Sequence, residues 1–421
     1  MSWCFFADSE KEPPQDHFVL GKNSHMKILA IGGSGGMGRH AVCAAQHFDD
    51  VEQIVVADLN EASARNFADQ LGKKVAGIGL DIENGGALRK AMADADLVMN
   101  TSGPFYRYAV QVLQAAIETK CHYLDICDDW EPTVEMLKLD QKAKEAGISA
   151  TVGLGASPGI SNLLALLAMK ELDSSSTVYT GWDFGGAKPE GESSQSNVNA
   201  AMLHGIEQMT GKVRIFRNGA YELTEPLAPV TVRYPGLTPF RGHIFGHPEA
   251  VTFPHNYPQL RESINLTHGG DIDSWLLKAI LGLVNQGLVS RSRAAALLAW
   301  FENRRGSVTE TTKPDFPPAM YGMAIGIKGG EPAIAGAAWF GEAVDSGGDS
   351  GLSMGAATGV PLACGAKLLL DGRIKQTGVL TPEAGHIDPL EFLREVFRQF
   401  ESAGRLRSGA LEDNVRISRT W

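Results

Sequence analysis

The feature that most constrains this chain is a strand–turn–helix–strand unit between Lys27 and Asp58. The apolar run Ile28–Ile31 predicts a buried strand, and it leads directly into a G-x-G-x-x-G turn. Apolar residues then recur at helical spacing, and a second apolar strand, Ile54–Ala57, ends at Asp58, twenty residues beyond Gly38. A plain strand-to-helix turn is the alternative, but the strand, helix and acid together favour a dinucleotide-binding unit.

The residues of this unit have separate predicted tasks. Gly33 permits a tight turn, Gly35 lets a pyrophosphate approach the backbone, and Gly38 lets the helix pack close to the sheet. The pyrophosphate would lie at the helix N-terminus, where free N–H groups and the helix dipole favour an anion. Asp58 would bind the adenosine ribose and repel a 2′-phosphate, so NAD is favoured over NADP. The predicted cofactor-binding residues of the turn are Gly33, Ser34, Gly35, Gly36, Met37 and Gly38.

The order of predicted elements indicates an α/β fold with two parts. Strands alternate with helices as far as Val152, which predicts a Rossmann-type, doubly wound parallel sheet. From Thr177 the predicted strands are longer and more polar, an Asn218-Gly219 pair indicates a hairpin, and a second α+β domain with a mixed sheet is expected. A small-residue helix is predicted over Asp349–Leu370, kinked or interrupted at Pro361.

The predicted domain boundaries follow from these patterns. We expect a flexible N-terminal extension at 1–25, a Rossmann domain at 26–155, a substrate-binding and dimerisation domain at 156–349, a segment at 350–403 that returns to the Rossmann domain, and a polar, frayed tail at 404–421.

Composition excludes several classes of function. The chain has 421 residues, enough for two or three domains, and a formal net charge of −11, which argues against a nucleic-acid or anionic-membrane surface. It has no apolar run long enough to span a membrane, and its first 25 residues lack the pattern of a signal peptide, so a cytoplasmic protein is expected. Five cysteines without C-x-x-C spacing predict neither disulfides nor a zinc site.

Two further groups of cofactor contacts are predicted where strands end. Ligands bind at the carboxyl ends of parallel strands, so Ser102, Gly103 and Pro104, after the fourth strand, are expected to shape the nicotinamide pocket. Asp81, after the third strand, is expected either near the adenine or as a helix cap. Arg107 is a candidate clamp for a substrate carboxylate, with a solvated surface arginine as the alternative.

The proposed acid–base residues follow the fifth strand. Asp128 or Asp129 would bind a substrate ammonium group or act as a general base, and the alternative is a pair of acids at a helix N-terminus. The histidines of the second domain show no metal-ligand spacing with a carboxylate, so no metal is predicted, and His247-Pro248-Glu249 is expected to be a turn. Arg233 and Arg241 are further candidate carboxylate clamps.

From Lys27 to about Phe400 the chain resembles the saccharopine dehydrogenase-like family, which includes saccharopine reductase, lysine 6-dehydrogenase and carboxynorspermidine dehydrogenase. The segments that carry the resemblance are Gly33–Gly38, Ser102–Phe105, His122–Asp129, Gly153–Asn162, Arg217–Gly219, Phe245–Glu249, Ser353–Met354 and Ala357–Pro361. The resemblance implies NAD(P)-dependent hydride transfer at the C–N bond of a secondary amine or imine, without a metal or a covalent step. It also implies a homodimer. Asp58 and the loop Ser102–Arg107 depart from the pattern of NADP-using saccharopine reductases.

Two rival functions are considered for the same fold. A cofactor-binding regulator or scaffold would lack convergent charged groups at the nicotinamide. A dehydrogenase acting at a C–OH centre would need a proton relay such as Tyr/Lys, and Tyr106 has no lysine near it in the sequence. The favoured hypothesis is an oxidoreductase acting on a small, amino-acid-derived molecule, with no nucleic-acid or membrane partner.

Overall fold

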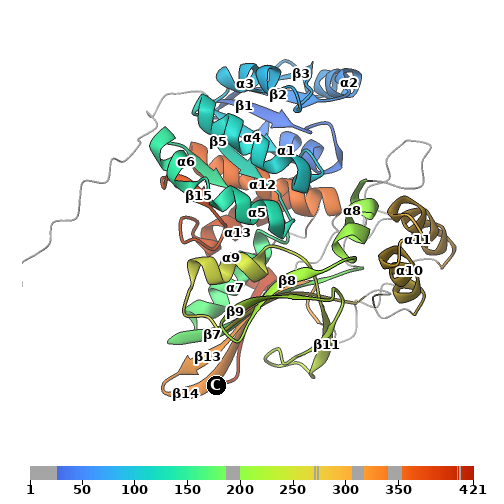
Figure 1. Cartoon of the computed structure of the whole chain (residues 1–421). Helices are drawn as coiled ribbons and strands as arrows, with labels where there is room; N and C mark the ends of the chain where they lie inside the picture. The colour runs from blue at the N-terminus through green and yellow to red at the C-terminus, as the bar shows by residue number, and fades with distance from the viewer. Residues whose placement is uncertain are drawn as a thin grey trace, which may run out of the picture.

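The computed structural model describes residues 26–185, 200–269, 272, 275–305, 317–339, 353–404, 406 and 409–421. The predicted extension at 1–25 therefore lies outside the described residues. Two sheets organise the chain: the first sheet and its helices occupy the upper part of Figure 1, and the second sheet the lower part. This arrangement confirms the predicted combination of a doubly wound sheet with a second, mixed sheet.

The first sheet has seven parallel strands in the order β15-β6-β5-β4-β1-β2-β3. Its centre is apolar because helices cover both faces, and β4 is buried along its whole length. The strands are β1 (Met26–Ile31), β2 (Val51–Asp58), β3 (Val75–Gly79), β4 (Leu97–Asn100), β5 (His122–Asp125), β6 (Ser149–Thr151) and β15 (Gly378–Leu380).

Helices alternate with these strands as the apolar spacing predicts. The predicted cap Asn60 accepts a hydrogen bond from the Ser63 amide at the start of α2. The segment from Trp130 to Ala146 forms two helices, because the chain leaves helical geometry at Leu139 and begins again one residue later. These helices are α1 (Gly36–Ala45), α2 (Glu61–Leu71), α3 (Gly85–Ala93), α4 (Phe105–Thr119), α5 (Trp130–Leu137), α6 (Asp140–Ala146), α12 (Met354–Leu370) and α13 (Pro389–Ser402).

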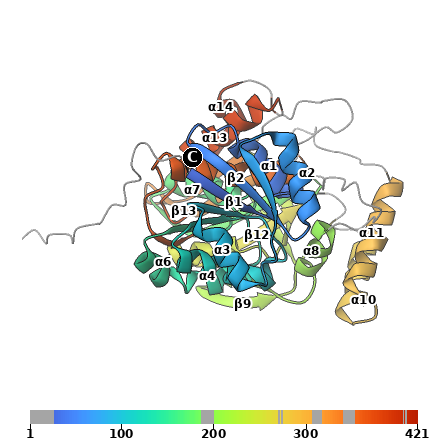
Figure 2. The same cartoon turned by 90° about the horizontal axis from the view of Figure 1, so that it is seen from above.

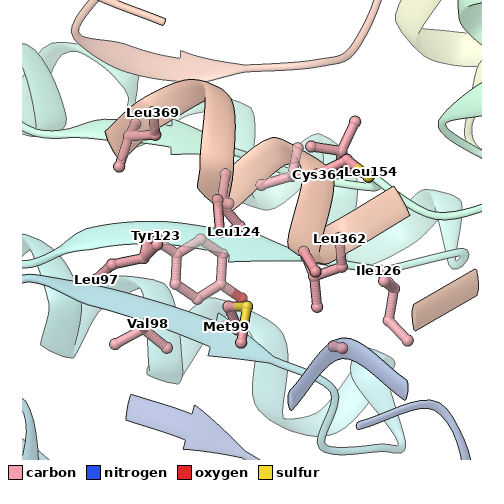
Figure 3. Close-up of a cluster of buried hydrophobic side chains, with 14 of the residues drawn as sticks. Leu97, Val98, Met99, Tyr123, Leu124, Ile126, Leu154, Leu362, Cys364 and Leu369 are labelled. Carbon is pink, nitrogen blue, oxygen red and sulfur yellow. The ribbon is translucent and has the colours of Figure 1, made fainter. Parts of the chain in front are cut away.

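The small-residue helix α12 returns from the C-terminal part of the chain and packs against α1. A Cβ on Gly359 would lie 2.2 Å from the Met37 carbonyl oxygen, so only glycine allows this approach, and a Cβ on Gly365 would displace the end of the Leu154 side chain. Figure 3 shows Leu362 and Leu369 of α12 in the buried cluster with β4 and β5. The helix continues through Pro361, so the predicted interruption is wrong. The first turn of the predicted helix, residues 349–352, lies outside the described residues.

The second sheet has nine strands, with the main order β10-β11-β12-β7-β13-β14-β16. Only β7 and β12 pair in parallel along that path, and β8 with β9 forms a hairpin beside β12. Asn218 and Gly219 have φ values of 54° and 79°, which confirms the predicted hairpin turn. The strands are β7 (Ser174–Asp183), β8 (Val213–Arg217), β9 (Ala220–Thr224), β10 (Pro229–Val232), β11 (Phe240–Ile244), β12 (Glu262–His268), β13 (Met320–Lys328), β14 (Glu331–Trp339) and β16 (Val415–Arg419).

The frayed tail expected from residue 404 onward is wrong for its last part. Residues Val415–Arg419 form β16, which pairs antiparallel with β14, and Arg419 forms an ion pair with Glu171 at 2.7 Å. A short helix, α14 (Leu411–Asn414), precedes this strand. The alternation of Val415 and Ile417 with polar residues is too short to predict a strand from sequence alone.

The remaining helices lie at the junction of the two sheets and along one side. They are α7 (Ile160–Lys170), α8 (Ala200–Gln208), α9 (Glu249–Asn256), α10 (Trp275–Asn285) and α11 (Arg291–Arg305). Seen from above, α10 and α11 stand to one side of the molecule, next to α8 (Figure 2). Among the helices that the structure describes, none is long and apolar enough to cross a membrane.

Candidate active site

The glycine-rich turn has the close packing that the sequence predicts, with one shift in position. Its left-handed residue is Gly32, at φ 71°, and not Gly33. A Cβ on Gly33 would instead lie 2.8 Å from the Ala30 carbonyl oxygen, so this glycine serves packing. A Cβ on Gly38 would lie 2.3 Å from the Gly32 oxygen, which confirms that α1 needs glycine there to approach the turn.

The start of α1 fits the pyrophosphate of a dinucleotide. Gly35 is the N-cap residue and is exposed, and Gly36 and Met37 open the helix. The first N–H groups of any helix lack partners within it, so this end offers donors and a positive dipole to an anion. Ser34 is buried beside it.

Asp58 lies at the end of β2, next to the turn. Its carboxylate accepts from the Ser34 hydroxyl at 2.6 Å and from the Asn60 amide at 3.1 Å. Arg39 lies nearby: its Nε donates to the Ser34 carbonyl oxygen at 2.6 Å, and its guanidinium lies over the Phe67 ring. Sequence reasoning missed Arg39, although a cation directly after Gly38 is a signal that bears on a 2′-phosphate.

Asp81 is exposed after β3, where it accepts from the Glu83 amide at 2.9 Å. The cap of α3 is Asn84, whose side chain accepts from the Ala87 amide, so the alternative of Asp81 as helix cap is wrong. Its place near an adenine stays a prediction.

A buried hydrogen-bond network fixes the loops that follow β4, β5 and β6. The Asn100 side chain accepts from the Ser102 hydroxyl at 2.6 Å and donates to the Tyr123 hydroxyl at 3.0 Å. Tyr123 in turn donates to Asp125 at 2.7 Å, and Asp125 accepts from the Gly153 amide at 2.7 Å. Burial raises the pKa of Asp125 to about 6. The ends of three neighbouring strands are therefore held in one arrangement.

The candidate residues that follow β4 lie in two places. Ser102, Gly103 and Pro104 lie between β4 and α4, with Ser102 held by Asn100. Arg107 does not join the acidic residues after β5, because its guanidinium pairs with Glu83 and lies over the Tyr108 ring. Its side chain is 60% exposed, as in the surface alternative.

Asp128 and Asp129 meet a histidine from α8, a helix between two strands of the second sheet. His204 Nε2 lies 3.1 Å from Asp128 Oδ1 and 3.4 Å from Asp129 Oδ1. Asp129 occupies the N-cap position of α5, yet its side chain makes no capping hydrogen bond and accepts instead from the Tyr106 amide at 3.1 Å. The alternative of an ordinary helix-initiating pair therefore does not account for these acids.

Helix α8 supplies further polar groups that sequence reasoning missed. Gln208 donates to the Asp128 carbonyl oxygen at 3.2 Å, and Glu207 forms an ion pair with Arg291 at 3.1 Å. His204, Glu207 and Gln208 recur at i, i+3 and i+4, so one face of this helix is polar, which was the available signal. The sequence does not show which strand end that face meets.

The close contact perturbs the protonation of all three groups. Burial opposes ionisation of Asp128, but the His204 charge outweighs it and lowers the pKa of Asp128. Burial and then the charge of Asp128 raise the pKa of Asp129 to about 7. Burial would lower the pKa of His204, but the neighbouring carboxylates raise it. Near neutral pH the cluster therefore holds an Asp128–His204 ion pair beside a carboxyl group ready to gain or lose a proton.

No metal is predicted from the sequence, because no histidine there is spaced as a metal ligand with a carboxylate. In the folded protein, however, Asp128, Asp129 and His204 have potential donor atoms within 4.8 Å of one another. One histidine and two carboxylates could hold a divalent cation. The same contacts are also explained without a metal, by the ion pair between His204 and Asp128. A cavity of about 580 Å³ lies elsewhere, between α7 and the start of α13, and contains none of these residues.

The fold and the site together define a class: a protein with a dinucleotide-binding sheet and an acid–base cluster at its carboxyl edge. Residues 28–151 match the family model described as the saccharopine dehydrogenase NADP binding domain. The chain therefore resembles that family over the first sheet, from β1 to β6.

Individual relatives are distant. The chain is 25% identical to carboxyaminopropylagmatine dehydrogenase of Synechocystis sp. over 56% of this chain and 60% of that protein. It is 29% identical to saccharopine dehydrogenase (NADP+, L-glutamate-forming) of Saccharomyces cerevisiae over 36% of this chain and 31% of that protein. The alignments thus span less than two thirds of either relative. The solved apo structure of the yeast saccharopine dehydrogenase shares the fold, with a TM-score of 0.58 and 18% identity over 94% of this chain and 100% of that one.

Proposed function

We propose that this protein is a nicotinamide-nucleotide-dependent oxidoreductase that acts at a C–N bond of a cationic, amino-acid-derived amine. The observation that carries the proposal is the Asp128–Asp129–His204 cluster, which adjoins the start of α4, just after the loop that follows β4, through the Tyr106 amide. Both curated relatives are dehydrogenases by name, of saccharopine and of carboxyaminopropylagmatine.

The residues of the chain have distinct roles in this proposal. The turn around Gly35 and the start of α1 would hold the pyrophosphate, and Asp58 the ribose. When bound, the nicotinamide would accept or supply a hydride. The Asp128–His204 pair would orient the substrate nitrogen, and Asp129 would take or return its proton, since its pKa is raised to about 7.

The charge of the site favours a cationic substrate. Asp128, Asp129 and Glu207 surround His204, and Arg291 is already paired with Glu207. Arg107 is paired with Glu83, so this candidate carboxylate clamp does not offset the acids. An ammonium or iminium group would therefore be attracted here, and a substrate rich in carboxylates would be repelled.

The proposal is tested by cofactor binding and turnover in the same preparation. NADH and NADPH are titrated by fluorescence, and amines are screened for a change in nicotinamide absorbance. We expect tighter binding of NADH, because Asp58 repels a 2′-phosphate. Asp58→Ala should reduce that preference about tenfold, the equivalent of about 1.4 kcal/mol.

Arg39→Ala is the matched variant, because it removes a positive charge where Asp58→Ala removes a negative one. It should weaken NADPH more than NADH, since Arg39 lies beside Ser34 and Asp58. Tighter binding of NADPH, abolished by Arg39→Ala, would reverse the assignment of the cofactor. Nucleotide binding without turnover on any amine would favour a regulator, and failure to bind either nucleotide would refute the proposed function.

A further inference from the structure

A second buried carboxyl group lies behind the site, at the start of α9. Glu249 is 1% exposed, and its Oε1 accepts three hydrogen bonds. They come from Ser157 at 2.6 Å, Ser161 at 2.8 Å and Asn265 at 3.0 Å. The serines belong to the segment that leads from β6 into α7, and Asn265 lies on β12, so three separate elements converge on one oxygen.

These bonds determine the hydrogen-bond roles of His247. A serine hydroxyl has one proton, and the Ser157 proton is directed to Glu249. The Ser157 oxygen also lies 3.2 Å from His247 Nδ1, so Nδ1 must be the donor in that contact. The neutral imidazole then carries its proton on Nδ1 and presents Nε2 as an acceptor. Protonation of Glu249 at Oε2 leaves this order unchanged, because Oε1 remains the acceptor.

The acceptor nitrogen faces the acid cluster. His247 Nε2 lies 3.9 Å from Asp128 Oδ2, while the other oxygen of Asp128 contacts His204. The ring plane is fixed by Trp182, which stacks on it at 5.4 Å between centroids. Two acceptors, a neutral nitrogen and an ionised carboxylate, thus face each other without a proton between them. A donor of N–H groups would satisfy both.

We propose that His247 is a substrate-binding residue that, together with Asp128, holds the N–H groups of the substrate nitrogen, and that Ser157 and Glu249 are positioning residues that keep His247 in the acceptor tautomer. The inference rests on the proposed function for the nature of the substrate, but the tautomer is a property of the chain alone.

The charged surroundings agree with this role. His247 faces Asp128 and His204. Glu249 faces Glu383, which is also a buried carboxyl group. Burial lowers the pKa of His247 to about 4, so the ring stays neutral at physiological pH. The sequence-based interpretation of His247-Pro248-Glu249 as a simple turn missed this arrangement because its partners lie about 90 residues earlier in the chain.

The first test is ¹⁵N NMR of the full-length protein labelled at histidine, with His247→Asn identifying the His247 signals. We expect a protonated, pyrrole-type Nδ1 and an unprotonated, pyridine-type Nε2. Ser157→Ala should move the proton toward Nε2, because it removes the acceptor of Nδ1–H. Glu249→Leu should do the same, because the Ser157 hydroxyl loses its acceptor and can then donate its proton to Nδ1. Ser161→Ala is the matched control: it removes one hydroxyl from the same carboxylate without touching His247.

The second test asks whether His247 binds N–H groups, with methylammonium chloride as the probe. Methylammonium should shift the His247 Nε2 signal, whereas tetramethylammonium, which has the same charge and no N–H, should not. A protonated Nε2 in the wild type, an unchanged tautomer in Ser157→Ala, or equal effects of the two cations would overturn the inference. NADH titration of the same samples tests the proposed function separately.

Discussion

At the residue scale, the site combines groups that the sequence could suggest with groups that it could not. Asp128 and Asp129 were predictable because they follow a strand of a parallel sheet, whose carboxyl ends bind ligands. His204 and His247 were not, because they reach the acids from α8 and from the loop before α9 through tertiary packing. Arg107, in α4, pairs instead with Glu83, which precedes α3.

The Asp128–His204 ion pair makes Asp128→Asn the most informative change for turnover. The amide cannot sustain the charge of His204 or attract a cationic amine. We expect kcat/KM to fall at least about 100-fold at neutral pH, the usual contribution of a positioned acid–base group. The affinity for NADH should be unaltered, which fluorescence titration checks. A fall of less than threefold would contradict a role for Asp128 in catalysis.

Asp129 gives a pH dependence of stability with a definite sign. Its pKa rises from 3.8 to about 7 on folding, so the folded state binds the proton more tightly. That contribution to stability is complete below pH 4 and is lost as the pH rises through 7. It amounts to at most about 4 kcal/mol, the energy equivalent of this rise in pKa.

Asp129→Asn should therefore gain stability relative to the wild type between pH 4 and pH 8. Urea unfolding at several pH values measures the difference in unfolding free energy. A difference that stays constant over this range would show that Asp129 titrates normally.

At the element scale, the alternation of strands and helices in the first sheet followed from apolar runs, caps and glycines. Helix α2, for example, starts after its capping Asn60 and ends before Gly72. The element that escaped was β16, since a five-residue edge strand carries little pattern and owes its place to β14. Helix α12 also continues through Pro361, and its close approach to α1 at Gly359 is a tertiary contact that local propensity does not include.

The turn between β1 and α1 should be intolerant of a single methyl group. Gly38→Ala would place a Cβ 2.3 Å from the Gly32 oxygen, so α1 must move away from the sheet. We expect a loss of about 1–3 kcal/mol in unfolding free energy and at least a tenfold loss in NADH affinity. Gly86→Ala in α3 is the control, because its Cβ would meet only Asn84 at 3.5 Å. Equal behaviour of the two variants would argue against the packing role of Gly38.

At the scale of the whole molecule, sequence reasoning gave two sheets but not the way they meet. The site needs the loop after β5 from one sheet and α8 and the loop before α9 from the part of the chain that forms the other. A pattern of local periodicities contains no information on such contacts, which depend on how large surfaces pack.

Strand β16 offers a test of the second sheet separate from the first. Deletion of residues 415–421 exposes the edge of β14, and we expect a lower melting temperature and a tendency to aggregate. NADH binding should persist, since the first sheet is untouched. Arg419→Ala removes only the half-exposed ion pair with Glu171 and should cost about 0.2–1 kcal/mol. A deletion no more harmful than Arg419→Ala would mean that β16 contributes little to the sheet.

The position of β15 has a consequence for how the protein is made. This strand, Gly378–Leu380, pairs with β6, Ser149–Thr151, at the border of the first sheet. During translation the ribosome releases six strands of that sheet long before it releases the seventh. The first sheet therefore remains incomplete, with the edge of β6 unpaired, while every strand of the second sheet except β16 is synthesised. Chaperones that shield strand edges would be needed most during that interval.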